Sequence, residues 1–165
     1  MKDITILTTG GTIDKIYFDA KSEYEVGPPN IERLLGELNL NLSYKIISLF
    51  RKDSLDITEE DRQIIRKAAE EAKSRRIIIT HGTDTMAETA NALIGIPNKT
   101  IVLTGALEPA LFKTSDAIFN VGCALGAVQS LGEGVYITMN GAVFNGDNVR
   151  KNLERNRFEE IHPTG

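Results

Sequence analysis

The sequence has too little cysteine, too little basic charge and too few long apolar runs for several common protein classes. Its one cysteine, Cys123, excludes an intrachain disulfide and with it the small secreted domains that disulfides hold together. No apolar run reaches the ~18 residues that a membrane-spanning helix needs, so no membrane partner is expected. Lysine and arginine number 19 against 23 acidic residues, a balance that excludes the usual electrostatic footprint of a nucleic-acid partner.

What is present fits one ordinary globular domain. The chain has 165 residues, close to the common size of a single domain, and 41% of them are hydrophobic, enough for a real core. The first seven residues have the length of a strand and lack the apolar run and the cleavage site of a signal peptide. Together with the single cysteine, this predicts a cytoplasmic protein.

Short apolar runs alternate along the chain with segments of helical spacing. Each run has the continuous apolar character of a parallel strand covered on both faces. The runs are 4–7, 45–49, 77–80, 100–103 and 135–138, and helices are expected after Asn30 and Thr58 and over about 84–95 and 115–131. This order predicts an α/β fold: an open, mainly parallel sheet flanked by helices on both faces, in one domain over 1–165.

Two segments of this plan carry further expectations. The segment 13–27 is read as a long irregular loop, and loops of that length are commonly functional lids. The predicted helix over 115–131 is poor in charge and is a candidate subunit contact, with Cys123 as a core thiol.

Small polar residues follow three of the predicted strands, where a parallel sheet binds its ligands. They are 8–12 after the first strand, 52–54 after the second and 81–85 after the third. Glycine at Gly11 brings a backbone amide close to a ligand, and the hydroxyl of Thr12 is a nucleophile if a neighbour removes its proton. Each of these patterns alone is more often an ordinary turn or a helix cap. Two of them at the same edge of the sheet favour a functional site there.

No metal site is predicted, because neither His81 nor His162 has a cysteine or acidic partner at metal-ligand spacing.

Two strings around these residues resemble the paired signatures of the bacterial-type L-asparaginases. They are Thr-Gly-Gly-Thr-Ile at 9–13 and His-Gly-Thr-Asp-Thr-Met at 81–86. Further similar stretches follow in the same order at 22–27, 53–58, 104–106, 115–120 and 146–151. The resemblance therefore covers most of the chain.

The resemblance implies hydrolysis of L-asparagine to L-aspartate and ammonia without a cofactor. Thr12 would be the nucleophile, and Tyr24 on the lid would close over it. A second catalytic cluster would comprise Thr83, Asp84 and Lys151, which handle protons and the attacking water. The residues expected to bind the substrate are Gly11, Asp53, Ser54, Thr83 and Asp84.

The sequence also departs from this family. The usual chain is about twice as long, with a smaller C-terminal domain that completes the active site across a subunit interface. We expect a short, single-domain relative without that domain, with weaker substrate affinity, that forms a homodimer or homotetramer. Glu108 stands where an arginine is common in the family, and Leu55 where a polar residue is, which blurs the choice of substrate.

Three alternatives stay open. The first is a hydrolase of glutamine or another small amide, including the ammonia-releasing part of an amidotransferase. The second is a catalytically silent relative that binds an amino acid. The third is a nucleotide-binding α/β module, which the lack of a complete phosphate loop disfavours.

Overall fold

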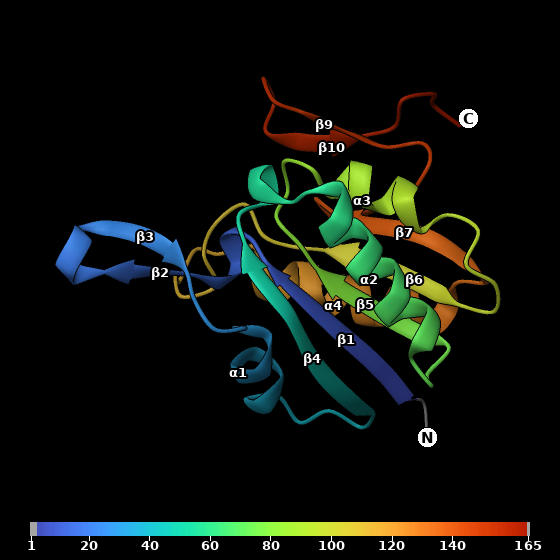
Figure 1. The fold of residues 1–165 in the computed structure, drawn as a ribbon, viewed down its shortest axis with the longest axis horizontal. Helices are drawn as coiled ribbons and strands as arrows, with labels where there is room; N and C mark the ends of the chain where they lie inside the picture. Colours follow the sequence, from blue (N-terminus) through green and yellow to red (C-terminus); the bar gives the residue numbers. More distant parts are fainter. Residues whose placement is uncertain (1–2, 165) are drawn as a thin grey trace.

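The computed structural model describes residues 3–164 and has a six-stranded sheet at its centre (Figure 1). Five strands run parallel, and the sixth is antiparallel to its neighbour at one edge. In order across the sheet they are β4 (Ser43–Lys52), β1 (Asp3–Gly10), β5 (Arg76–Thr80), β6 (Thr100–Thr104), β7 (Gly134–Met139) and β8 (Ala142–Asn145). Each predicted apolar run lies in one of the parallel strands, which confirms the predicted open, mainly parallel sheet.

Helices cover both faces of this sheet. Helices α2 (Glu59–Glu71) and α3 (Met86–Leu93) pack on one face, and α1 (Ile31–Gly36) and α4 (Ala117–Ser130) pack on the other. The four predicted helices are all present, with ends that differ by a few residues. None of the helices within 3–164 is both long and apolar enough to cross a bilayer.

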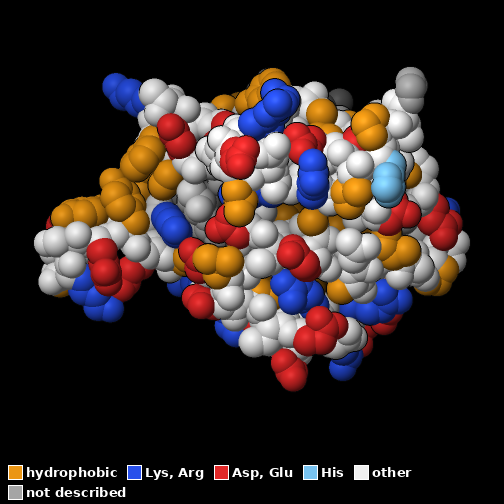
Figure 2. Space-filling model, turned by 90° about the horizontal axis from the view of Figure 1, so that it is seen from above, with side chains coloured by type: hydrophobic (Ala, Val, Ile, Leu, Met, Phe, Trp, Pro, Cys, Tyr) orange, Lys and Arg blue, Asp and Glu red, His pale blue; other side chains and the backbone are white. Residues whose placement is uncertain are grey.

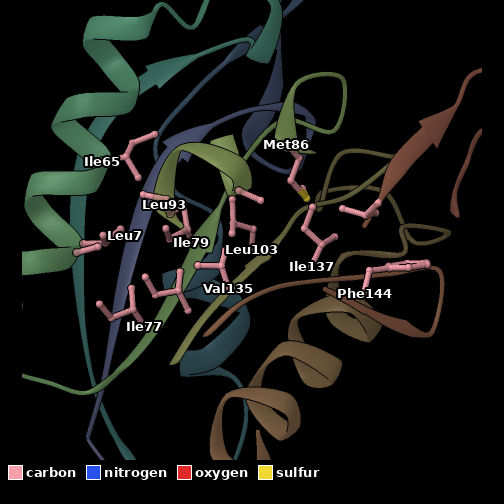
Figure 3. Packing of buried hydrophobic residues seen from close by; sticks show 14 of the residues in the cluster. Leu7, Ile65, Ile77, Ile79, Met86, Leu93, Leu103, Val135, Ile137 and Phe144 are labelled. Atoms are coloured by element: carbon pink, nitrogen blue, oxygen red, sulfur yellow. The ribbon is translucent and has the colours of Figure 1, made fainter. Parts of the chain in front are cut away.

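The core is divided by the sheet because successive strand residues point to opposite faces. Leu7, Ile79 and Leu103 belong to the cluster under α2 and α3 (Figure 3). Ile6 and Ile78, one position earlier in each strand, belong to the cluster under α1 and α4. Burial on both faces explains why these strands read as unbroken apolar runs.

Of two residues expected to precede and cap helices, one caps α2 and the other does not cap α1. The side chain of Thr58 accepts a hydrogen bond from the Asp61 amide (3.2 Å), and the Asp61 carboxylate accepts one from the Thr58 amide (2.9 Å), the predicted cap of α2. Asn30 precedes α1 without capping it, because its backbone is already helical. Cys123 was expected in the core, but it is only partly buried, in a shallow pocket between α4 and the start of β8.

Two hairpins were not anticipated. The segment predicted as an irregular lid is a hairpin of β2 (Lys15–Phe18) and β3 (Glu23–Val26), in which Tyr17 pairs with Tyr24. It projects from the body, with exposed aromatic side chains along it (Figure 2). The second hairpin is β9 (Arg150–Asn152) with β10 (Arg157–Glu159), which lies beside α3 outside the main sheet (Figure 1).

Candidate active site

The site begins between β1 and β5, which are neighbours in the sheet. After β1 the chain passes through the lid hairpin to α1 on one face, and after β5 it passes to α3 on the other. Connections that leave adjacent parallel strands toward opposite faces open a crevice at their carboxyl ends. Thr12 follows β1 and Thr83 follows β5, so both turns border this crevice.

The two turns touch through glycine. The backbone of Gly11 has a φ of +86°, and a Cβ there would lie 2.4 Å from the amide nitrogen of Gly82. The Gly11 amide also donates a hydrogen bond to the carbonyl of Lys52 (2.9 Å). Only glycine allows this approach, which brings the backbone next to Thr12 against the backbone next to Thr83.

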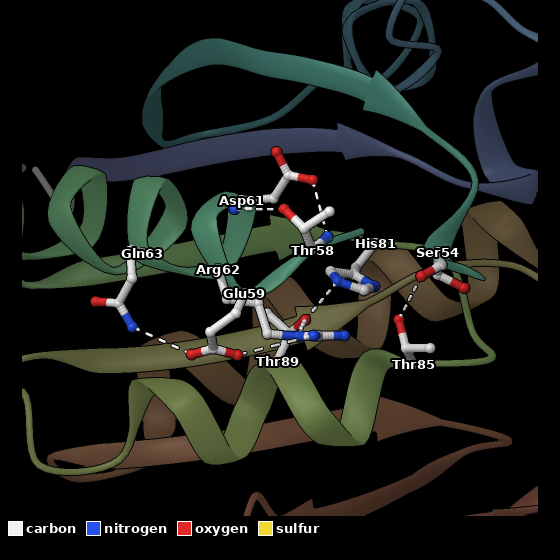
Figure 4. Close-up of polar contacts among 9 residues, drawn as sticks. All are labelled: Ser54, Thr58, Glu59, Asp61, Arg62, Gln63, His81, Thr85 and Thr89. Carbon is white, nitrogen blue, oxygen red and sulfur yellow. Dashed lines mark hydrogen bonds and ion pairs between the residues drawn. The ribbon is translucent and has the colours of Figure 1, made fainter. Parts of the chain in front are cut away.

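The turn after β4 joins the same contact. A Cβ on Gly82 would lie 2.6 Å from the Cβ of Ser54, a buried residue in a short 3₁₀ helix over Ser54–Asp56. The hydroxyl of Thr85 donates to the Ser54 carbonyl (2.7 Å; Figure 4). The three turns that carry Thr12, Ser54 and Thr83 are therefore packed together.

Lys151 joins the turn after β5 from the second hairpin. Its ammonium donates to the hydroxyl oxygen of Thr83 and to Oδ1 of Asp84, each at 2.8 Å. The Lys151 side chain is 12% exposed, so the pair is largely shielded from water on the lysine side. Because the Thr83 oxygen accepts from lysine, its own hydrogen can point to another acceptor.

Thr83 and Asp84 lie two to three residues before α3, which begins at Met86 and not at about residue 84 as expected. The N-cap position is held by Thr85, and the two residues form a turn ahead of it. Thr83 is buried and Asp84 is exposed. The turn conformation lets both side chains meet Lys151.

A buried histidine supports this turn from behind. The ring of His81 lies 2.7 Å from the Gly82 carbonyl through Nδ1 and 2.7 Å from the Thr89 hydroxyl through Nε2 (Figure 4). Arg62 Nε donates to that hydroxyl (3.1 Å), which leaves the hydroxyl hydrogen for Nε2 and places the ring hydrogen on Nδ1. Burial, with the nearby Arg62 charge, lowers the pKa of His81 to about 4. The ring is therefore a neutral structural contact.

The loop after β6 is braced by two residues from the stretches that resemble the family. The carboxylate of Asp116 accepts hydrogen bonds from the amides of Leu107 (3.0 Å) and Glu108 (3.1 Å). The buried side chain of Asn120 donates to the Gly105 carbonyl (2.9 Å) and to Asp116 (2.8 Å). These contacts fix the backbone of the loop beside the crevice.

Tyr24 lies on the lid hairpin and is 48% exposed. Its ring makes edge-to-face contacts with two other aromatic rings. The centroid of the Tyr17 ring lies 5.3 Å from that of Tyr24, and the centroid of the Phe112 ring lies 5.7 Å from it. Phe112 belongs to the loop after β6, so this aromatic contact connects the lid to the body of the molecule.

Asp53 faces the base of the lid. Its carboxylate accepts a hydrogen bond from the Leu55 amide (3.1 Å) and pairs with Lys15 (3.3 Å). An open cleft of about 520 Å³ lies here, between the hairpin and the end of β4. Its lining residues include Lys15, Tyr24, Arg51 and Asp53.

Asp14, which was not predicted from the sequence, holds the base of the lid in place. Its backbone carbonyl accepts from the Gly27 amide (2.8 Å) and its buried carboxylate from the Asn30 amide (2.8 Å). Burial raises the pKa of Asp14 to about 7, against the opposing effects of the Asn30 hydrogen bond and the Arg51 charge. No sequence pattern marks Asp14, because its role depends on contacts with Gly27 and Asn30 that form only when the hairpin folds.

Within 3–164, no group of three or more histidine, cysteine, aspartate or glutamate side chains is arranged to hold a metal ion.

Residues 3–161 match the family model described as Asparaginase, N-terminal. The chain is 31% identical to a glutaminase-asparaginase from Pseudomonas fluorescens biotype A, over 96% of the chain and 48% of that protein. It is 30% identical to one subunit of the glutamyl-tRNA(Gln) amidotransferase of Methanococcus maripaludis strain C5, over 98% of the chain and 40% of that relative.

Among solved structures, the thermostable L-asparaginase from Thermococcus kodakarensis matches with a TM-score of 0.83 and 30% identity, over 98% of the chain and 52% of that structure. The chain thus spans about half the length of the relatives it matches.

Proposed function

Since this chain belongs to the asparaginase family, whose N-terminal domain it matches over residues 3–161, we propose that it hydrolyses L-asparagine to L-aspartate and ammonia. The observation that carries the proposal is the contact between the turns of Thr12 and Thr83, made through Gly11 and Gly82. Lys151 adds a cation that hydrogen-bonds a hydroxyl and a carboxylate at the same place. A purely structural turn needs no such combination.

In the proposed first step, the Thr12 oxygen bonds to the amide carbon of the substrate and the carbon–nitrogen bond breaks. The nitrogen leaves as ammonia after it takes up the proton that Thr12 gives away, and an ester of Thr12 remains. The backbone amides near Gly11 and Thr83 would stabilise the negative oxygen that forms on the way. In other enzymes, one such donor contributes about 3 kcal/mol of transition-state stabilisation.

In the second step, water attacks the ester carbon, aspartate leaves and the proton returns to Thr12. The Thr83 hydroxyl would orient the water, while Lys151 and Asp84 hold that hydroxyl and balance the charge. Their hydrogen bonds of 2.8 Å support this role. Tyr24 would close over Thr12 when the hairpin moves toward the body.

The charged ends of the substrate would be held by Ser54, Asp53 and Asp84. Ser54 lies against Gly82, beside the crevice, and the Asp84 carboxylate is exposed, as a contact for a substrate ammonium group requires. The Asp53 carboxylate also forms an ion pair with Lys15 at the base of the lid. Its contribution to substrate binding would therefore depend on the position of the lid.

A second candidate reaction is the release of ammonia from glutamine or another small amide. The Pseudomonas relative is named a glutaminase-asparaginase, and the Methanococcus relative is part of an amidotransferase. Both reactions use the same chemistry at the amide carbon, so substrate length separates them. A comparison of ammonia release from L-asparagine and L-glutamine decides between the two.

The decisive experiment measures coupled ammonia release by the parent chain and by Thr12→Ala and Thr83→Ala. We expect Thr12→Ala to lose about a thousandfold or more in kcat, because acyl transfer has no other nucleophile. Thr83→Ala should lose nearly as much, because assisted water attack fails. Thr12→Ser keeps a hydroxyl and is the matched control, with partial activity.

Substantial turnover by Thr12→Ala contradicts the assigned nucleophile. Binding of L-aspartate by the parent chain without ammonia release over hours favours the catalytically silent relative instead.

We also propose that the protein acts as a homodimer or homotetramer, supported by the exposed apolar side chains on α4. The cytoplasmic location expected from the sequence stays a prediction.

A further inference from the structure

Lys151 is presented by a hairpin that shares no strand with the main sheet. Within this hairpin Lys151 pairs with Phe158, so both side chains lie on the same face. Phe158 is buried in the core under α2 and α3, and its amide donates to the side chain of Asn140 (2.8 Å). That face is therefore turned toward the body and directs Lys151 to Thr83.

The residues on either side of Lys151 share one partner. The Arg150 guanidinium donates to the Glu159 carboxylate through Nε (3.1 Å) and Nη2 (2.8 Å). The side-chain amide of Asn152 donates to both Glu159 oxygens, each at 3.2 Å. Because side chains alternate along a strand, Arg150 and Asn152 leave β9 on the face opposite to Lys151. Glu159 therefore binds β9 on both sides of Lys151.

We propose that Glu159 is a positioning residue that holds the Lys151 ammonium on Thr83 and Asp84, an inference that rests on the proposed function of this site. Each strand of the hairpin has three residues, so few backbone hydrogen bonds hold β9 in place. The Glu159 contacts add four side-chain hydrogen bonds between β9 and β10. Without them the ammonium leaves the position that the second reaction step needs.

The titration behaviour of Glu159 agrees with this role. Hydrogen bonds from Asn152 and Arg150 hold the pKa of its carboxyl below the ordinary value. The carboxylate therefore stays charged, and its hold on β9 persists, across the neutral range.

The test compares Glu159→Ala with Glu160→Ala, its neighbour. Glu160 accepts hydrogen bonds from Thr164, toward the end of the chain, and none from β9. Glu159→Gln keeps the shape and one acceptor oxygen and serves as the conservative rescue. Folding of each variant is checked by circular dichroism, and Glu159→Gln carries the test if the alanine variant does not fold.

The first measurement is the acetylation rate of Lys151 by acetic anhydride, followed by peptide mass spectrometry, with the 74% exposed side chain of Lys67 as internal reference. We expect Glu159→Ala to raise this rate about fivefold, because it frees a paired amine. Glu160→Ala should leave it unchanged, and Glu159→Gln should fall between. This readout needs no enzymatic activity, so it tests the positioning even if the parent chain releases no ammonia.

The second measurement is the split between kcat and KM for L-asparagine. Glu159→Ala should lower kcat about tenfold with KM changed less than about twofold, as expected when a group that acts after binding is displaced. Equal Lys151 acetylation in Glu159→Ala and Glu160→Ala overturns the proposal. So does a kcat equal to the parent's in an active Glu159→Ala variant.

Discussion

Single residues without side chains decide the geometry of this site. Gly11 touches Gly82, and Gly82 touches Ser54, at separations that leave no room for a methyl group. The hydroxyl and carboxylate groups of the site are carried by neighbours of these glycines. The position of Thr12 relative to Thr83 is therefore set by backbone contact before any side chain interaction contributes.

We therefore expect Gly11→Ala to lower both stability and activity. The new methyl group would lie 2.4 Å from the Gly82 nitrogen, on a backbone with a φ of +86° that L-residues rarely adopt. We expect a loss of at least about 2 kcal/mol in the free energy of unfolding. Urea denaturation followed by circular dichroism measures it.

Gly122→Ala is the matched control. Gly122 lies within α4, and nothing approaches within 4 Å of its missing methyl group. Alanine there should raise stability by up to about 1 kcal/mol. Equal stability of Gly11→Ala and the parent protein would show that the two turns are not held in contact.

The sequence predicts some of these residues and not others, for a physical reason. Thr12 and Thr83 follow apolar runs that are recognisable as strands, so their place at one sheet edge follows from topology. Asp14 and Glu159 have no such local signal. Their roles arise from contacts with Asn30 and with Arg150 that depend on how two hairpins fold.

At the scale of elements, the parallel strands could be predicted from the sequence and the hairpins could not. The parallel strands are buried on both faces and appear as apolar runs. The β2–β3 hairpin is mostly exposed and mixes tyrosine, glutamate and lysine, so its pattern does not differ from that of a loop. Its tip turns through Ser22 at a φ of +50°, without the glycine that often marks a hairpin.

The base of this hairpin predicts a pH dependence. Burial raises the pKa of Asp14 to about 7 in the folded protein, above the 3.8 of an unperturbed aspartate. Between these values the folded state binds the proton more tightly, so this carboxyl makes the protein less stable as pH rises through that range. Above about pH 7 the Asp14 carboxyl is deprotonated in both the folded and the unfolded state, and its titration causes no further loss of stability.

We therefore expect Asp14→Asn to gain stability relative to the parent protein between pH 5 and pH 8, by on the order of 2 kcal/mol. Urea denaturation measures the free energy of unfolding of the variant and of the parent at both pH values. Any pH-independent effect of the amide on stability then cancels in the comparison. Glu154→Gln, in the exposed turn between β9 and β10, is the control for loss of one acid. A pH-independent difference for Asp14→Asn would contradict the raised pKa.

At the scale of the whole molecule, the two sides of the sheet differ in how completely they are covered. On the side of α4, apolar side chains stay exposed: Ile118 at 45%, Phe119 at 58% and, on β8, Val143 at 51%. Phe119 lies against Gly141 in the turn between β7 and β8, so the helix and the sheet edge form one continuous apolar face. Such a face on a small domain is typical of a subunit contact.

We expect this face to join copies of the chain. Sedimentation velocity at micromolar concentration should show a dimer or larger assembly for the parent protein. Replacing Ile118 and Phe119 together by lysine should raise the dissociation constant about a hundredfold, because two charges would be buried in an apolar contact. Leu153→Lys is the control, since Leu153 is 75% exposed on the β9–β10 turn, away from α4. If the parent protein sediments as a monomer, or if the control dissociates it equally, this face does not form the subunit contact.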